Sequence, residues 1–122
     1  MIFEFKLPLI TPHMSMAVIE CFHAASGTSL KAGSKLLDLS VDLSSSFSQD
    51  CPPISFFRII VRENAILREF LVVRGQACPE GELIAVFSTV ADEAIDQPVS
   101  RGIRLATAGI FHHDGMWTGS VP

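Results

Sequence analysis

The sequence has few cysteines and no long hydrophobic run, and each shortage excludes a class of protein. Three cysteines among 122 residues are too few and too scattered for a disulfide framework, which favours a reducing compartment. Hydrophobic residues make up 48% of the chain, yet apolar runs such as residues 83–87 are far shorter than the roughly 20 residues that cross a bilayer. The first residues also lack the basic and then apolar regions of a signal peptide. We therefore expect a cytoplasmic protein without a membrane segment.

Positive charge is also scarce. The formal net charge is −4, and six arginines are spread along the chain without forming a basic stripe. Binding to nucleic acid is therefore not expected. Only three lysines occur, Lys6, Lys31 and Lys35. The length suffices for one domain with a modest hydrophobic core.

Two short segments resemble each other at a distance of 48 residues. Residues 27–33 (GTSLKAG) and 75–81 (GQACPEG) both begin and end on glycine. The likeness extends without a gap from 17–41 to 65–89, where five positions are identical and most apolar positions keep their character. This ordered set favours an internal duplication, with a compact glycine turn in each half. The structural turns are assigned to Gly27, Gly33, Gly75 and Gly81.

Short strands separated by turn residues account for most of the chain. The segment 54–62, rich in Ile, Phe and Val, is the strongest strand signal. Residues 65–73 are also compatible with a helix, but their counterpart 17–24 precedes the same kind of glycine turn, which favours a strand. The expected strands are 1–7 (an edge strand), 17–24, 35–42, 54–62, 65–73 and 81–89. The phenylalanines expected in the core are Phe3, Phe5, Phe56, Phe57 and Phe70.

Two segments fall outside this pattern. Residues 43–53 hold four serines and paired prolines, and they form a loop longer than the roughly two to five residues usual in a hairpin. After residue 90 the repeat ends. Residues 102–111 are a further candidate strand, and Asp114-Gly115 is a hairpin signal. We expect this tail to form a hairpin that packs on a sheet face or edge, of its own chain or of a second copy.

Residues 6–90 resemble the lipoyl domains of the acyltransferase components of 2-oxoacid dehydrogenase complexes. Those domains begin Met-Pro-x-Leu-[Ser/Thr]-Pro-x-Met, and the segment 27–39 resembles their Gly-Asp-x-Val-x-x-Gly-x-x-Leu-Leu-x-Val. Residues 68–87 resemble the second half of the family. The matching positions of the first motif are Leu7, Pro8, Ile10, Thr11, Pro12 and Met14. The resemblance implies an all-β fold, a flattened β-barrel or barrel-sandwich hybrid, made of two pseudo-twofold-related four-stranded halves.

The lysine on which the family depends is missing. In lipoyl and biotinyl domains a lysine at the tip of the hairpin between the halves carries the cofactor through an amide bond. Here Leu43 occupies that position beside Asp42, and residues 43–53 contain no lysine. Leucine has no amine, and the cofactor would have supplied the chemistry. We therefore expect no cofactor, no metal and no catalytic residue.

The resulting hypothesis is a non-catalytic lipoyl/biotinyl-like domain at residues 1–90, followed by a C-terminal extension at 91–122. This domain would act in protein interaction or assembly. By resemblance, its partner would be a component of a 2-oxoacid dehydrogenase-like or acyltransferase-like complex, and a homo-oligomer is a further candidate. The alternative is a carrier domain of an acyltransferase or carboxylase system that is modified at an unusual residue.

Other reactive side chains have simpler explanations. The His-His-Asp run at 112–114 could bind a metal, but neighbouring residues of a strand point to opposite faces, and hairpin polarity explains the run better. His23 with Cys21 and Cys51 could form a nucleophile pair. No third group is apparent that would orient the histidine, and cysteine is commonly buried. Neither set is therefore expected to form a site.

Overall fold

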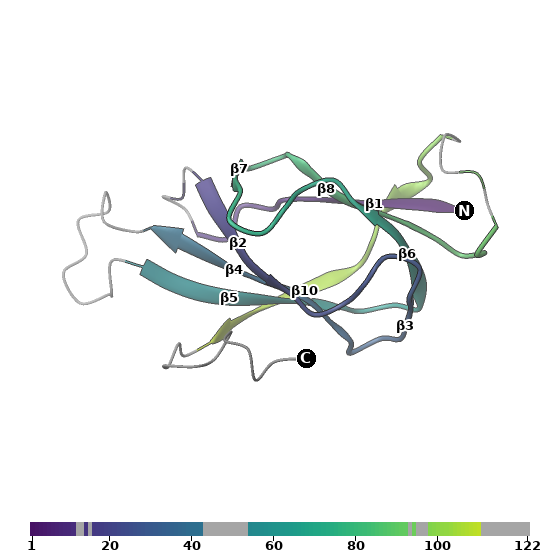
Figure 1. Cartoon of the computed structure of the whole chain (residues 1–122), viewed down its shortest axis with the longest axis horizontal. Coiled ribbons are helices and arrows are strands. Elements are labelled where there is room, and N and C mark those ends of the chain that lie inside the picture. The colour runs from purple at the N-terminus through teal and green to yellow at the C-terminus, as the bar shows by residue number, and fades with distance from the viewer. Residues whose placement is uncertain (12–13, 15, 43–53, 93, 95–97, 111–122) are drawn as a thin grey trace.

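The computed structural model describes residues 1–11, 14, 16–42, 54–92, 94 and 98–110, and this part of the chain is all-β (Figure 1). Sheet A contains, in spatial order, β3 (Ser29–Leu30), β6 (Ala65–Phe70), β8 (Leu83–Ser88), β1 (Ile2–Lys6) and β9 (Arg101–Gly102). Sheet B contains, in spatial order, β10 (Leu105–Ile110), β5 (Ile54–Val61), β4 (Lys35–Asp42), β2 (Met16–Phe22) and β7 (Ala77–Pro79). Within these ranges no helix occurs, so no helix there could cross a membrane.

The two sheets have equivalent strand orders. If β1, β2, β3 and β4 are taken as equivalent to β5, β6, β7 and β8, each sheet has the same order of strands. β9 in sheet A and β10 in sheet B then occupy equivalent outer positions. The pair β2–β4 has a β-bulge between Ile19 and Cys21, and the pair β6–β8 has one between Leu67 and Glu69. The expected strands are confirmed, including the one at 65–70. Among the described residues the pairing gives two five-stranded sheets and does not close them into one barrel.

The four glycines of the turns have a backbone conformation that side chains disfavour. Their φ angles lie between 88° and 96°, a range in which a Cβ would crowd the backbone. In the first turn Gly27 N donates to Leu67 O at 2.6 Å, and in the second Gly75 N donates to Ile19 O at 2.7 Å. Each turn is thus hydrogen-bonded to a strand of the other half of the chain. The four residues are Gly27, Gly33, Gly75 and Gly81.

The hydrophobic core lies between the two sheets. Phe3 and Phe5 are buried in it, and Phe57 and Phe70 pack against it from partly exposed positions. Phe56, which the sequence places in the core, is half-buried on the outer face of sheet B. The reason is that successive residues of a strand point to opposite faces, so Phe56 and Phe57 cannot both point inward.

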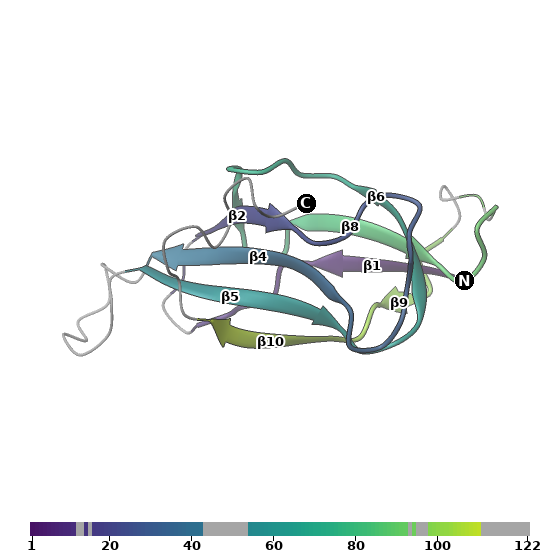
Figure 2. The same cartoon turned by 60° about the horizontal axis from the view of Figure 1, so that its bottom comes forward.

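The C-terminal extension adds one strand to each sheet. β9 pairs in parallel with β1, and β10 pairs antiparallel with β5, so that β10, β5 and β4 lie side by side (Figure 2). The first segment, expected to be an edge strand, therefore lies between β8 and β9 at Phe3 and Glu4. Within the candidate strand at 102–111, the structure has β10 at Leu105–Ile110, and residue 111 lies outside the described residues. The hairpin expected at Asp114-Gly115 lies outside the described residues.

A charged contact attaches the extension to the rest of the fold. Arg101 donates from both terminal nitrogens to the two carboxylate oxygens of Glu63, at 2.6 Å each, and its guanidinium carbon lies 4.3 Å from the centre of the Phe3 ring. The backbone N–H of Arg104 also donates to Glu63, at 2.8 Å. The hydrogen bonds from Arg101 lower the pKa of Glu63 to about 2. The ionised carboxylate therefore ties β9 to the turn between β5 and β6.

The turn conformation generates a stability prediction. Gly81→Ala should lower the free energy of unfolding by about 1–2 kcal/mol, because alanine is strained at a positive φ. The matched control is Gly109→Ala on β10, where φ is not positive and an added Cβ meets no atom within 4 Å. Urea unfolding measures both differences. Equal effects of the two substitutions would contradict the role assigned to the turn.

The ion pair of Glu63 generates a prediction about pH. The carboxyl titrates near 4.5 in its ordinary state and at about 2 in the fold, so its contribution to stability is present above pH about 4.5 and is lost as the pH falls towards 2. Wild type should therefore exceed Glu63→Gln in unfolding free energy at neutral pH, and the difference should vanish near pH 2. Urea unfolding across this range measures it, with the exposed Glu80→Gln as control. A difference that stays constant with pH would refute the prediction.

Candidate functional site

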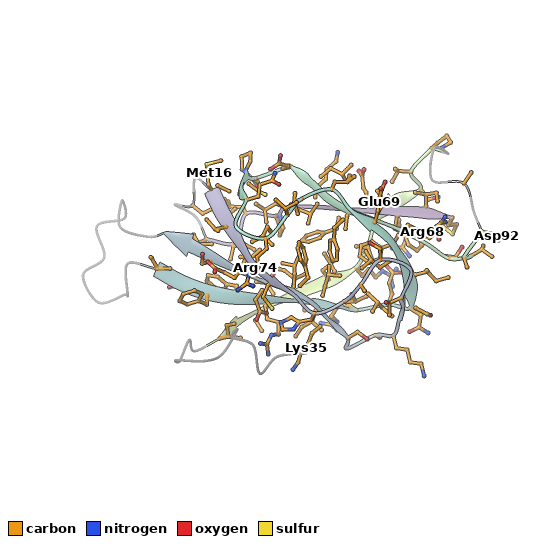
Figure 3. The ribbon with its side chains drawn as sticks, in the orientation of Figure 1. Met16, Lys35, Arg68, Glu69, Arg74 and Asp92 are labelled. Atoms are coloured by element: carbon orange, nitrogen blue, oxygen red, sulfur yellow. The ribbon has the colours of Figure 1, made fainter. Side chains whose placement is uncertain are left out.

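The segment between β4 and β5 is where the resemblance to lipoyl domains predicts the attachment hairpin. β4 ends at Asp42, which pairs with Ile54 at the start of β5. Leu43 and the rest of 43–53 lie outside the described residues. Lys35 lies at the other end of β4 (Figure 3), and eight residues of strand separate the ends by about 23 Å. Neither Lys35 nor Lys31 before it can therefore take the place of a lysine at the hairpin.

A group of polar side chains lies on the outer face of sheet B. We call Cys21, His23, Asp38 and Arg58 the Asp38 cluster. The Asp38 carboxylate accepts from Arg58 Nε at 2.8 Å and from a terminal nitrogen of Arg58 at 3.1 Å. Its second oxygen lies 2.9 Å from His23 Nε2, and Cys21 Sγ lies 3.9 Å from the same nitrogen. The Asp38 side chain is fully buried, while those of His23 and Arg58 are 17% and 20% exposed.

Strand register brings this cluster together. Asp38 on β4 is the direct partner of Arg58 on β5 and of Cys21 on β2. The bulge in β2 places one extra residue, Glu20, between Ile19 and Cys21. If the strands paired one to one after Ile19 and Leu39, Glu20 would stand opposite Asp38. The bulge therefore determines that a thiol faces the buried carboxylate.

The electrostatics of the cluster argue against a cysteine nucleophile. Burial raises the pKa of the Cys21 thiol, and the negative charge of Asp38 raises it further. A catalytic thiolate needs the opposite shift. In addition, Asp38 and Cys21 both approach Nε2 of His23, whereas an orienting acid and a nucleophile must use different ring nitrogens. The arrangement is thus not a catalytic triad.

The structure supplies the third group that is not apparent in the sequence. Cys21 and His23 are close together as their spacing suggests, and Asp38 joins them from a neighbouring strand. Cys51 lies outside the described residues, as do the histidines and the aspartate at 112–114. One feature of the sequence could have identified Asp38 as a candidate. It is a charged residue within an apolar strand, and the residues before and after it are buried. Buried carboxylates need a partner.

Exposed apolar side chains gather at the hairpin end of sheet B. Met16 and Ile54 are 43% and 49% exposed on the outer face (Figure 3 labels Met16). They lie on β2 and β5, the two strands beside β4, at the same height as Asp42. Val18 and Ile110 lie on the next level of the same face and are half-buried. We call Met16, Val18, Ile54 and Ile110 the hairpin-end patch. Met16 and Val18 lie on β2, Ile54 and Ile110 lie on the paired strands β5 and β10, and β4 separates the two pairs. Exposed apolar residues gathered on a sheet face are typical of contact surfaces.

Comparisons with known proteins do not add to this geometry. No protein-family model matches the chain, and no curated protein is significantly similar to it. The functional interpretation therefore depends on the residues themselves.

The pairing of Asp38 with Arg58 generates a stability prediction. Arg58→Met removes the guanidinium and leaves a fully buried carboxylate without its main partner, which should cost about 3 kcal/mol of unfolding free energy at neutral pH. The control is Arg62→Met, at an exposed arginine that directly follows β5. Chemical denaturation measures both. A loss no larger than that of the control would show that Arg58 does not compensate the buried charge.

Proposed function

We propose that this chain is a non-catalytic, lipoyl/biotinyl-like module that has lost its attachment lysine and works in protein interaction or assembly. The observation that carries the proposal is the composition of the β4–β5 hairpin. Its strands pair up to Asp42 and Ile54, and the eleven connecting residues, 43–53, contain no lysine. An amide-linked cofactor needs an amine at that place, and the last lysine of the sequence is Lys35.

The equivalence of the two halves supports the assignment to this class of domain. Beyond the strand order, individual contacts recur at the 48-residue offset. Ser40 Oγ donates to Glu20 Oε2 at 2.6 Å, and at the corresponding positions Arg68 donates to Ser88 Oγ at 3.2 Å. Such recurrence is expected of an internal duplication folded as a barrel-sandwich hybrid, in which each half would contribute four strands.

The two corresponding aromatic residues support the same reading. Phe22 and Phe70 occupy equivalent positions in the two halves, and their ring centres are 4.3 Å apart. Equivalent residues can only meet in this way near an axis that relates the halves. The geometry therefore favours a pseudo-twofold axis through this contact, between β2 and β6.

The hairpin-end patch is the surface that we assign to the partner. It lies at the end of sheet B that leads into 43–53, with Ile54 on β5 and the other three residues on β2 and β10. A lipoyl or biotinyl domain presents this end to its enzymes. Met16 and Ile54 offer apolar area without charge, which fits a protein surface better than a polar ligand. By resemblance, the partner is a 2-oxoacid dehydrogenase-like or acyltransferase-like component. A cytoplasmic location fits the free thiols of Cys21 and Cys78.

The alternative is a carrier domain that is modified at an unusual residue. The same fold would then hold a cofactor through a group other than a lysine amine. Nothing in the described part of the hairpin favours this alternative, because Asp42 and Ile54 offer no amine or thiol. One purification can separate the two hypotheses.

The experiment is an affinity purification of the full chain from its own source cells, with two mass-spectrometric readouts. We expect the intact mass to equal that of the unmodified chain. We also expect subunits of a dehydrogenase or acyltransferase complex to co-purify, and to be lost with the double variant Met16→Asp, Ile54→Asp. Val73→Asp, at a 66% exposed residue in the connection from β6 to β7, is the matched control.

The intact mass and the co-purifying proteins can each contradict a different part of the proposal. A lipoyl or biotinyl adduct on the chain would establish the alternative and reject the proposal. An unmodified chain whose co-purifying proteins are unchanged in the double variant, or lost equally in Val73→Asp, would reject the patch as the contact surface. Circular dichroism of each variant shows whether the fold is retained.

A further inference from the structure

Three side chains of the Asp38 cluster bring different metal-binding atoms to one place. Cys21 Sγ, His23 Nε2 and an oxygen of Asp38 all lie within 4.8 Å of one another. They come from β2, from the residue that follows β2, and from β4, so the sheet itself holds two of them. Sulfur, imidazole nitrogen and carboxylate oxygen are the three protein donors that Zn²⁺ accepts.

The spacing of these atoms is close to that of a tetrahedral site. Bonds of about 2.0–2.3 Å at tetrahedral angles place donor atoms about 3.4–3.6 Å apart. Here His23 Nε2 is 3.9 Å from Cys21 Sγ and 2.9 Å from the Asp38 oxygen. These two separations are within about half an ångström of the tetrahedral values, and Cys21 Sγ lies within 4.8 Å of the Asp38 oxygen. The approach of both neighbours to a single ring nitrogen, which excludes a catalytic triad, is what a common metal ligand set requires.

The surroundings hold the donors in place. Arg58 binds both oxygens of Asp38 and fixes the carboxylate plane, as outer partners of metal ligands do. The backbone N–H of His23 donates to Leu36 O at 2.9 Å, which anchors the residue that carries the imidazole.

The opposite half of the fold shows that packing does not require these residues. At the 48-residue offset, Cys21, His23 and Asp38 correspond to Glu69, Leu71 and Val86. That half has the same bulge and the same strand pairing, and a hydrocarbon side chain fills the position of the buried carboxylate. The donor set is thus an addition to one half of the fold.

We propose that Cys21, His23 and Asp38 form a three-residue Zn²⁺ site whose fourth position takes water or a ligand atom from a partner. On binding, the ion replaces the proton of the Cys21 thiol, which leaves to solvent, and Zn–S, Zn–N and Zn–O bonds form without any change of oxidation state. The metal charge then neutralises the buried thiolate and carboxylate, while Arg58 stays hydrogen-bonded to Asp38. The site is independent of the missing attachment lysine and goes beyond the proposed binding function.

The test uses the full chain, kept reduced with a phosphine, and Co²⁺ as a spectroscopic substitute for Zn²⁺. We expect one Co²⁺ per chain, with a thiolate-to-cobalt band in the near ultraviolet and intense visible bands of four-coordinate cobalt, all removed by added Zn²⁺. Cys21→Ser should abolish the near-ultraviolet band, and His23→Gln should weaken binding at least about tenfold. Amide NMR spectra confirm that each variant keeps the fold.

Matched controls separate this site from other donors of the chain. Cys78→Ser removes a second buried thiol, whose pKa is raised to about 12, mainly by burial, and it should leave the spectrum unchanged. Cys51→Ser and the pair His112→Gln, His113→Gln should do the same. No cobalt spectrum with wild type, or a spectrum that survives Cys21→Ser or is lost equally with Cys78→Ser, would overturn the proposal.

Discussion

The fold depends on hydrogen bonds that each half of the chain donates to the other. Gly27 at the first turn donates to Leu67 in β6, and Gly75 at the second turn donates to Ile19 in β2. Both donors are glycines with a positive φ, a backbone conformation that other residues adopt only with strain. Each sheet therefore contains strands from both halves, and neither half can close its own sheet. The burial of the core between the sheets follows from this exchange.

Local sequence patterns predicted the strands and the turns, because both depend on neighbouring residues. The glycine spacing and the 48-residue offset predicted the strands β2, β4, β6 and β8, whereas the short strands β3 and β7 lie inside the segments expected as glycine turns. The place of β1 inside sheet A was not predictable, since it depends on the two-residue strand β9, which is too short to leave a pattern. Phe56 shows the same limit, because the face of a strand that turns inward is set by its register.

The Asp38 cluster could be predicted only in part. The neighbours Cys21 and His23 are visible as a pair in the sequence, but their third partner comes from another strand and its position depends on a bulge at Glu20. A bulge leaves no reliable mark on the sequence. The outer face of sheet B thus carries a polar cluster, in which ion pairs compensate a buried carboxylate. The same face carries an apolar patch at the hairpin end. Sheet A has no equivalent of the cluster in the described residues, so the two halves differ in chemistry while they agree in connectivity.

The position of β1 has a consequence for the order in which the chain can fold. Ile2 pairs with Ser88, and Phe3 pairs with Phe87 and Arg101, so β1 is synthesised well before the strands with which it pairs. Folding dominated by such distant pairings is slow, and the waiting segments stay open to wrong contacts. Until β8 and β9 leave the ribosome, the apolar side chains of β1 have no sheet to join. During synthesis β1 therefore exposes its apolar side chains until its partners in sheet A have been made.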